Sequence, residues 1–150
     1  MNADYKRLLQ AADEAGCYEF PSRFDYEGLE RRARLAQSRI HRETGEITKF
    51  EGGNFNQDAS FSIAICFDRR SVKKPEGICI PTIRFSNFGN LVSTCWAELF
   101  SPDTLSLVIK VLQEEGFHYI PEVELDCEYD GVMKGQIPKW TWWGRYFDWV

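Results

Sequence analysis

Hydrophobic residues recur every three or four positions before residue 45, and this spacing predicts two amphipathic helices. The first segment, ADYKRLLQAADEAG, ends on Gly16, a residue type that often follows the last turn of a helix. The second segment, DYEGLERRARLAQSRIHRE, carries an apolar stripe made of Tyr26, Leu29, Ala33, Ala36 and Ile40. Each helix therefore has one face that must pack against the rest of the protein.

Charged residues cover the remaining faces of the second helix. Glu27, Glu30 and Glu43 are interspersed with arginines at positions 31, 32, 34, 39 and 42. A solvated helix face is the usual meaning of such mixed charge, and an anion site is the alternative.

From about residue 46 the hydrophobic period changes to two, which is typical of strands. In FSIAICF, the residues Phe61, Ile63, Ile65 and Phe67 alternate with smaller ones. The runs ICIPTIRFS and LVSTCW follow after turn-like loops, so the three segments predict an antiparallel meander. Pro81 cannot donate to a ladder, and its strand is expected to be an edge strand or to bulge there.

A third helix is marked by its end signals and is expected at about residues 102–115. Ser101 is suited to the N-cap, Pro102 to the first turn, and Gly116 to the position just past the end. The 150 residues contain no linker and no repeat, and a chain of this length buries enough surface for one core. The pattern predicts a single α+β domain over residues 1–150, with two N-terminal helices and the third helix packed on a mainly antiparallel sheet.

The segment EVELDCEYDG has an acid at every second position. In a regular strand these side chains would share one face at intervals of about 6.6 Å, and they are Glu122, Glu124, Asp126, Glu128 and Asp130. That spacing is too wide for two neighbours to share a proton or for several to enclose one calcium ion. The row is therefore either the solvent-facing side of a strand or a surface for a basic partner.

The C-terminal segment KWTWWGRYFDWV concentrates large aromatic side chains. Their rings need an extensive apolar counterpart, which is either the core of the domain itself or a partner that meets them as interface anchors. The members that we consider for partner binding are Trp142, Trp143, Tyr146 and Trp149.

Charge narrows the choice of partner. Lysine plus arginine and aspartate plus glutamate number nine and nine in residues 1–50, five and five in 51–100, and four and nine in 101–150. The net charge of -5 therefore comes from the last third of the chain. This distribution disfavours nucleic acid and favours a basic protein as the partner.

Catalytic and metal-binding signatures are missing from the sequence. The five cysteines have no CxxC spacing and lie mostly in strand-like runs, which indicates reduced core thiols. Cys95 and His118 flank the third helix and are the one thiol–imidazole pair that could act as nucleophile and base. No two cysteines or histidines have zinc-ligand spacing, and no phosphate or dinucleotide motif occurs, so we expect no metal and no cofactor.

The start of the chain has no signal-peptide pattern, and no apolar run approaches the length of a membrane span, so we expect a cytoplasmic protein without a membrane partner. The leading hypothesis is an acidic protein-binding domain, of the kind that inhibits a basic, nuclease-like bacterial toxin as an immunity protein does. The alternatives are a small cysteine- or carboxylate-dependent hydrolase and a ligand-binding α+β domain with an aromatic pocket. A deep pocket with His118 would favour the enzyme, whereas an open acidic face would favour the binding protein.

Overall fold

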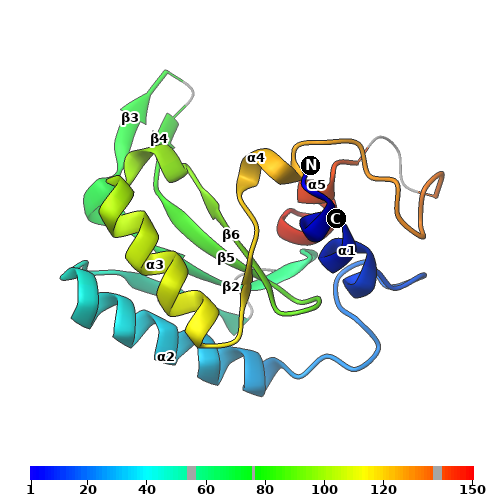
Figure 1. The fold of residues 1–150 in the computed structure, drawn as a ribbon, viewed down its shortest axis with the longest axis horizontal. Coiled ribbons are helices and arrows are strands. Elements are labelled where there is room, and N and C mark those ends of the chain that lie inside the picture. Colours follow the sequence, from blue (N-terminus) through cyan, green and yellow to red (C-terminus); the bar gives the residue numbers. More distant parts are fainter. Residues whose placement is uncertain (54–56, 76, 137–139) are drawn as a thin grey trace.

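A five-stranded mixed sheet, covered on one face by two long helices, forms the centre of the computed structural model (Figure 1). The structure describes residues 1–53, 57–75, 77–136 and 140–150. In these residues the α-helices are α1 (Ala3–Ala12), α2 (Tyr26–Thr44), α3 (Pro102–Glu114), α4 (Glu122–Leu125) and α5 (Trp142–Phe147). The strands are β1 (Lys49–Glu51), β2 (Phe61–Cys66), β3 (Val72–Lys74), β4 (Gly77–Cys79), β5 (Thr82–Ser86), β6 (Leu91–Cys95) and β7 (His118–Tyr119).

The strand order in the sheet is β1-β2-β5-β6-β7. Its first four strands are antiparallel, with Ile65 opposite Ile83 and Phe85 opposite Val92, and β7 is parallel to β6. The predicted α+β class and the antiparallel meander are thereby confirmed.

The segment ICIPTIRFS does not form one strand. It divides at Pro81 into β4, which pairs with β3 in a separate hairpin, and β5, which belongs to the main sheet. Pro81 has no N–H for a ladder, but its carbonyl accepts a bond of 2.9 Å from the backbone of Phe67. The proline thus ends one strand and begins the approach to the next.

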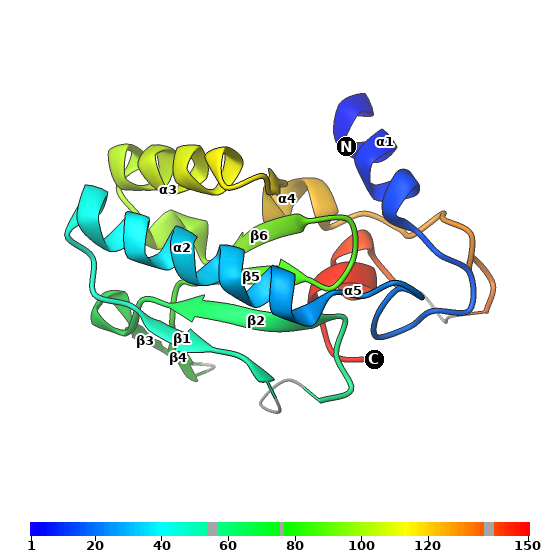
Figure 2. The same cartoon turned by 90° about the horizontal axis from the view of Figure 1, so that it is seen from below.

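The helices α2 and α3 lie side by side over one face of the sheet (Figures 1 and 2). Their apolar stripes meet the sheet, and Ala33, Ala36, Ile40, Val108 and Leu112 are fully buried. Ser101 caps α3 as expected, because its side chain accepts a hydrogen bond from the backbone N–H of Thr104.

A second hydrophobic cluster lies at the end of the molecule opposite the β3–β4 hairpin (Figures 1 and 2). There α1 packs with α4 and α5 rather than beside α2. The buried members of this cluster are Leu9, Phe88, Leu91, Ile120, Leu125, Tyr129, Met133, Trp142, Tyr146 and Phe147. Both chain ends are therefore built into one core.

The acidic segment 122–130 does not form the regular strand that its alternation predicts, and that prediction was wrong. Among the described residues its one strand-like pairing is an isolated antiparallel bridge between Glu128 and Thr141. Glu122–Leu125 forms one helical turn after Pro121. Leu125 and Tyr129, four positions apart, are buried, whereas Val123 is 81% exposed. Proline before a helix and the glutamates in its first turn both favour the helical start, and glutamate is a poor strand former.

Candidate functional site

The five carboxylates of the acidic segment point in different directions because the segment turns. The carboxylate of Glu124 is occupied by the start of the chain, where the backbone N–H of Asn2 donates to it at 2.7 Å. The carboxylate of Asp130 pairs with Lys6 of α1. Glu128 is 76% exposed, with the Lys134 amine 3.4 Å away. Two acids of the predicted row, Glu122 and Asp126, remain without an ion pair in the described part of the chain.

The C-terminal aromatic residues divide between the core and the surface. Trp142 and Tyr146 are fully buried, as the core alternative anticipates, so in this fold they offer no surface to a partner. Trp143 is partly exposed on the other side of α5. Trp149 is 50% exposed, and its ring meets Phe61 edge-on with the centroids 5.4 Å apart.

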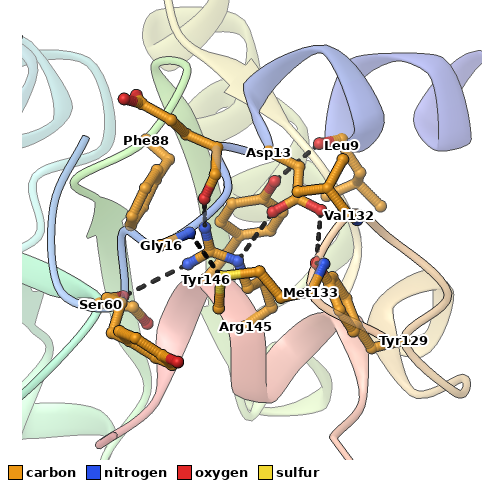
Figure 3. Close-up of polar contacts among 12 residues, drawn as sticks. Leu9, Asp13, Gly16, Ser60, Phe88, Tyr129, Val132, Met133, Arg145 and Tyr146 are labelled. Carbon is orange, nitrogen blue, oxygen red and sulfur yellow. Dashed lines mark hydrogen bonds and ion pairs between the residues drawn. The ribbon is translucent and has the colours of Figure 1, made fainter. Parts of the chain in front are cut away.

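A buried polar network fixes α5 in this orientation (Figure 3). Arg145 Nε donates to Asp13 Oδ1 at 2.9 Å, and neither side chain is exposed to solvent. The other carboxylate oxygen of Asp13 accepts from the Tyr129 hydroxyl and the Val132 backbone N–H, while the Tyr146 hydroxyl donates to the Leu9 carbonyl. Burial and the neighbouring Asp13 raise the pKa of Tyr129 to about 12. These buried polar groups make their hydrogen bonds within the protein, so the network has a structural role.

A groove of about 670 Å³ opens where α4, the end of β6 and the start of α5 converge. We call it the acidic–aromatic groove, and its lining residues are Ala97, Glu98, Tyr119, Pro121, Glu122, Val123, Asp126, Thr141 and Trp143. Three members of the predicted site, Glu122, Asp126 and Trp143, thus come together. The lining has three carboxylates and no lysine, arginine or histidine.

The turn after β6 positions one wall of the groove. Trp96 adopts a left-handed backbone conformation with φ +60°, which bends the chain into the short 3-10 turn Ala97–Leu99. Its side chain lies beneath the Lys74 amine, 4.1 Å from the ring centre, and the same amine is 3.6 Å from Glu98. Sequence reasoning missed Trp96 and Glu98, because their place beside α4 depends on the tertiary fold.

The surroundings of Glu122 disfavour the charged form of its carboxylate. Loss of water around its carboxylate raises the pKa of Glu122, and the nearby charges of Glu98 and Asp126 raise it further. The backbone N–H of Trp96 and the charge of Arg84 oppose this shift. Arg84 donates to the Phe147 carbonyl at 2.5 Å, and its guanidinium lies over the rings of Phe61 and Trp143, 4.5 Å and 5.6 Å from their centres, so it reaches the aromatic side of the groove without pairing with Glu122. Glu122 is therefore a carboxylate whose charge is not neutralised by a salt bridge.

The structure does not bring Cys95 and His118 together. His118 is paired with Leu91, and Cys95 lies four residues further along β6, which is about 13 Å of strand. Burial raises the pKa of the Cys95 thiol to about 11, so the reactive thiolate is scarce at neutral pH. The geometry gives no support to a cysteine–histidine hydrolase.

No cluster of three histidine, cysteine, aspartate or glutamate side chains in the described residues is arranged to hold a metal ion. None of the helices in the described ranges has the length and apolar character needed to cross a membrane. Comparisons with protein-family models, with curated proteins and with solved structures each found no match.

Proposed function

We propose that this chain is a protein-binding domain that receives a basic segment of a partner protein in the acidic–aromatic groove. The observation that carries the proposal is the composition of the groove, whose three carboxylates and tryptophan are accompanied by no lining cation. Lys74 already lies 3.6 Å from Glu98, so a lysine or arginine from a partner would supply the charge that Glu122 and Asp126 lack.

Glu122 gives the groove a physical reason to bind a cation. Its raised pKa means that the charged carboxylate has lost hydration without gaining an equivalent partner. A lysine or arginine close to Glu122 and Asp126 would compensate that loss, and the ring of Trp143 can add a cation–π contact. The exposed side chain of Val123 provides apolar surface beside the charges.

The more specific form of the proposal is an inhibitor of the immunity type, which neutralises a basic, nuclease-like toxin in the cytoplasm. The net charge of -5 and the sequence pI of about 5.1 support it, because long-range attraction speeds association with a basic protein. Such an inhibitor needs a docking surface and no catalytic machinery of its own.

The test of docking uses a set of capped basic peptides together with basic proteins encoded beside the gene of this chain. Glu122→Gln with Asp126→Asn is expected to weaken binding about tenfold or more and to reduce its dependence on salt. The matched control is Glu128→Gln, an acid of the same segment outside the groove, which should change affinity less than about twofold.

Two results separate the levels of the proposal. If a neighbouring basic protein binds and loses nuclease activity in the complex, the inhibitor function is supported. If basic peptides bind but no neighbouring gene product does, the toxin inhibitor is rejected and groove docking stands. Unchanged affinity in the Glu122→Gln, Asp126→Asn variant rejects groove docking itself.

A further inference from the structure

A second cavity, which we call the apolar pocket, lies between α1 and the C-terminal end of α3. Its volume is about 490 Å³, within the range of binding cavities. Figure 2 shows α1 beyond the end of α3, so these two helices do not cover one another. The pocket is lined mainly by apolar and aromatic side chains, which include Tyr5, Leu8, Ile109, Phe117, Tyr119 and Pro121. No lysine, arginine, aspartate or glutamate is among its lining residues.

The apolar pocket marks the place where the two hydrophobic clusters of the protein meet. Tyr5 and Leu8 are three positions apart on one face of α1 and pack against the cluster at the chain ends. Ile109 packs against the other cluster, the one between the sheet and its two long helices. All three side chains are only partly buried, and each lines the pocket. The fold therefore leaves apolar surface from both clusters in contact with water, and covering that surface is favourable.

The apolar pocket is continuous with the acidic–aromatic groove. Tyr119 and Pro121 line both cavities, and they lie in the short segment that joins β7 to α4. The groove places the carboxylates of Glu122 and Asp126 on its side of this segment, whereas the pocket offers rings and aliphatic side chains. One stretch of a partner that crosses Pro121 can reach both.

We propose that the apolar pocket receives a large apolar side chain from the same partner segment whose lysine or arginine docks in the acidic–aromatic groove. The inference rests on the proposed function and adds a second recognition element to it. Attraction between charges brings any basic protein to an acidic surface, so it selects poorly among basic partners. An anchor that fills an apolar pocket is the usual source of strong binding at an interface, and it mainly slows dissociation.

The distance between the two cavities limits the sequence of the partner. Tyr119 and Pro121 are about 6.6 Å apart along an extended chain. Three extended residues of a partner reach about 10 Å, so the apolar residue and the cation should be about two to four positions apart. The expected partner motif is thus leucine, methionine or phenylalanine close to lysine or arginine.

The experiment titrates the full chain by calorimetry with capped peptides that contain a Lys-Arg pair and one leucine. The leucine stands two, three or four positions before or after the pair, and each peptide has a counterpart with alanine in its place. The best leucine peptide should bind at least about fivefold more tightly than its alanine counterpart. If the alanine peptides bind and no leucine peptide binds more tightly, the pocket is overturned and groove docking stands. If no peptide of either kind binds, groove docking is rejected and this inference fails with it.

Two variants of α3 show whether the leucine enters the apolar pocket. Ile109→Asn, which makes the lining polar without adding charge, should reduce the advantage of the leucine peptide to less than about twofold. Leu107→Asn is the matched control, because Leu107 is exposed on the same helix and does not line the pocket, and it should keep the full advantage. Equal advantages in the two variants overturn the proposal.

A measurement on the natural sequence holds even if Ile109→Asn fails to fold. A photoreactive leucine in the best peptide should cross-link to α1 or to residues 109–121, and mass spectrometry locates the labelled positions. Cross-links confined to other parts of the chain overturn the pocket as the site of the anchor.

Discussion

Asp13 and Arg145 are 132 positions apart in the sequence, yet they form an ion pair of 2.9 Å from which solvent is fully excluded. Asp13 follows α1, and Arg145 lies in α5, so the pair joins the two ends of the chain. The guanidinium of Arg145 also donates to the carbonyls of Tyr18 and Glu14 and lies 4.2 Å from the centre of the Phe88 ring. The positive charge of Arg145 is therefore balanced by the Asp13 carboxylate, two backbone carbonyls and an aromatic ring.

Arg145→Met is expected to destabilise the fold by about 3 to 5 kcal/mol, because it leaves the Asp13 carboxylate buried without its cation. Urea unfolding measures the change. Arg7→Gln serves as the control, since its pair with Asp4 is exposed at the surface and should contribute no more than about 1 kcal/mol. A loss for Arg145→Met as small as that of the control would show that the pair does not hold the chain ends together.

Trp142 and Trp143 are neighbours in sequence with opposite expected roles. Trp142→Ala should destabilise the fold by about 3 to 5 kcal/mol, because the ring is fully buried against Tyr129 and Tyr146. Trp143→Ala should retain the fold and instead speed dissociation of a groove-bound basic peptide, by about 2 kcal/mol or more in binding free energy. Thermal unfolding and dissociation rates of both variants check the contrast. A Trp143→Ala variant with an unchanged dissociation rate would remove this ring from the binding surface.

Alkylation should distinguish the cysteines of the native protein. Cys66 and Cys95 are buried, and burial raises the pKa of each thiol to about 11, so both should react slowly at neutral pH and faster as the pH approaches 11. Cys17 and Cys127 are both partly exposed and should be labelled before the buried thiols. Cys127 should react first of the two, because loss of hydration and the nearby Glu14 raise the pKa of the Cys17 thiol. Mass spectrometry of peptides after timed labelling gives the order. Rapid labelling of Cys95 at neutral pH would contradict it and revive a thiol-based activity.

The helices and the antiparallel strands could be predicted from the sequence because their signals are local. The stripe of α2 and the Ser101 cap of α3 require no knowledge of the rest of the chain. The end of α1 shows where local signals fail. The helix stops at Ala12, well before Gly16, because Asp13 leaves helical geometry and its carboxylate meets Arg145.

The acidic segment was misassigned for the same physical reason. Its strict alternation gives a period of two, but a strand also needs a neighbour for its backbone. Pairing with β6 stops at Tyr119 before Pro121, and only the stretch around Glu128 finds a new neighbour, in a single bridge to Thr141. Pro121 followed by Glu122 and Glu124 is a helix-start pattern, which was a usable signal. The groove could not be predicted from the sequence, since the whole of α3, β7 and α4 lies between Glu98 and Trp143.

Docking in the acidic–aromatic groove should depend on pH through Glu122. In the free protein, loss of water and neighbouring negative charges raise the pKa of this carboxylate. A bound lysine or arginine favours the charged form and lowers that pKa, so binding releases a proton wherever Glu122 is still partly protonated. Affinity should therefore rise with pH from the ordinary glutamate range through the raised pKa of Glu122 and become constant above it.

A capped peptide with lysine and arginine as its sole ionisable residues isolates this effect, because the peptide itself does not titrate below neutral pH. Calorimetry in two buffers of different ionisation enthalpy counts the protons released. Glu122→Gln should remove the part of the pH dependence that lies above the ordinary glutamate range, while Glu128→Gln should keep it. If the Glu122→Gln variant releases as many protons as the natural sequence, the cation is not bound beside Glu122, and the groove must hold it at another carboxylate.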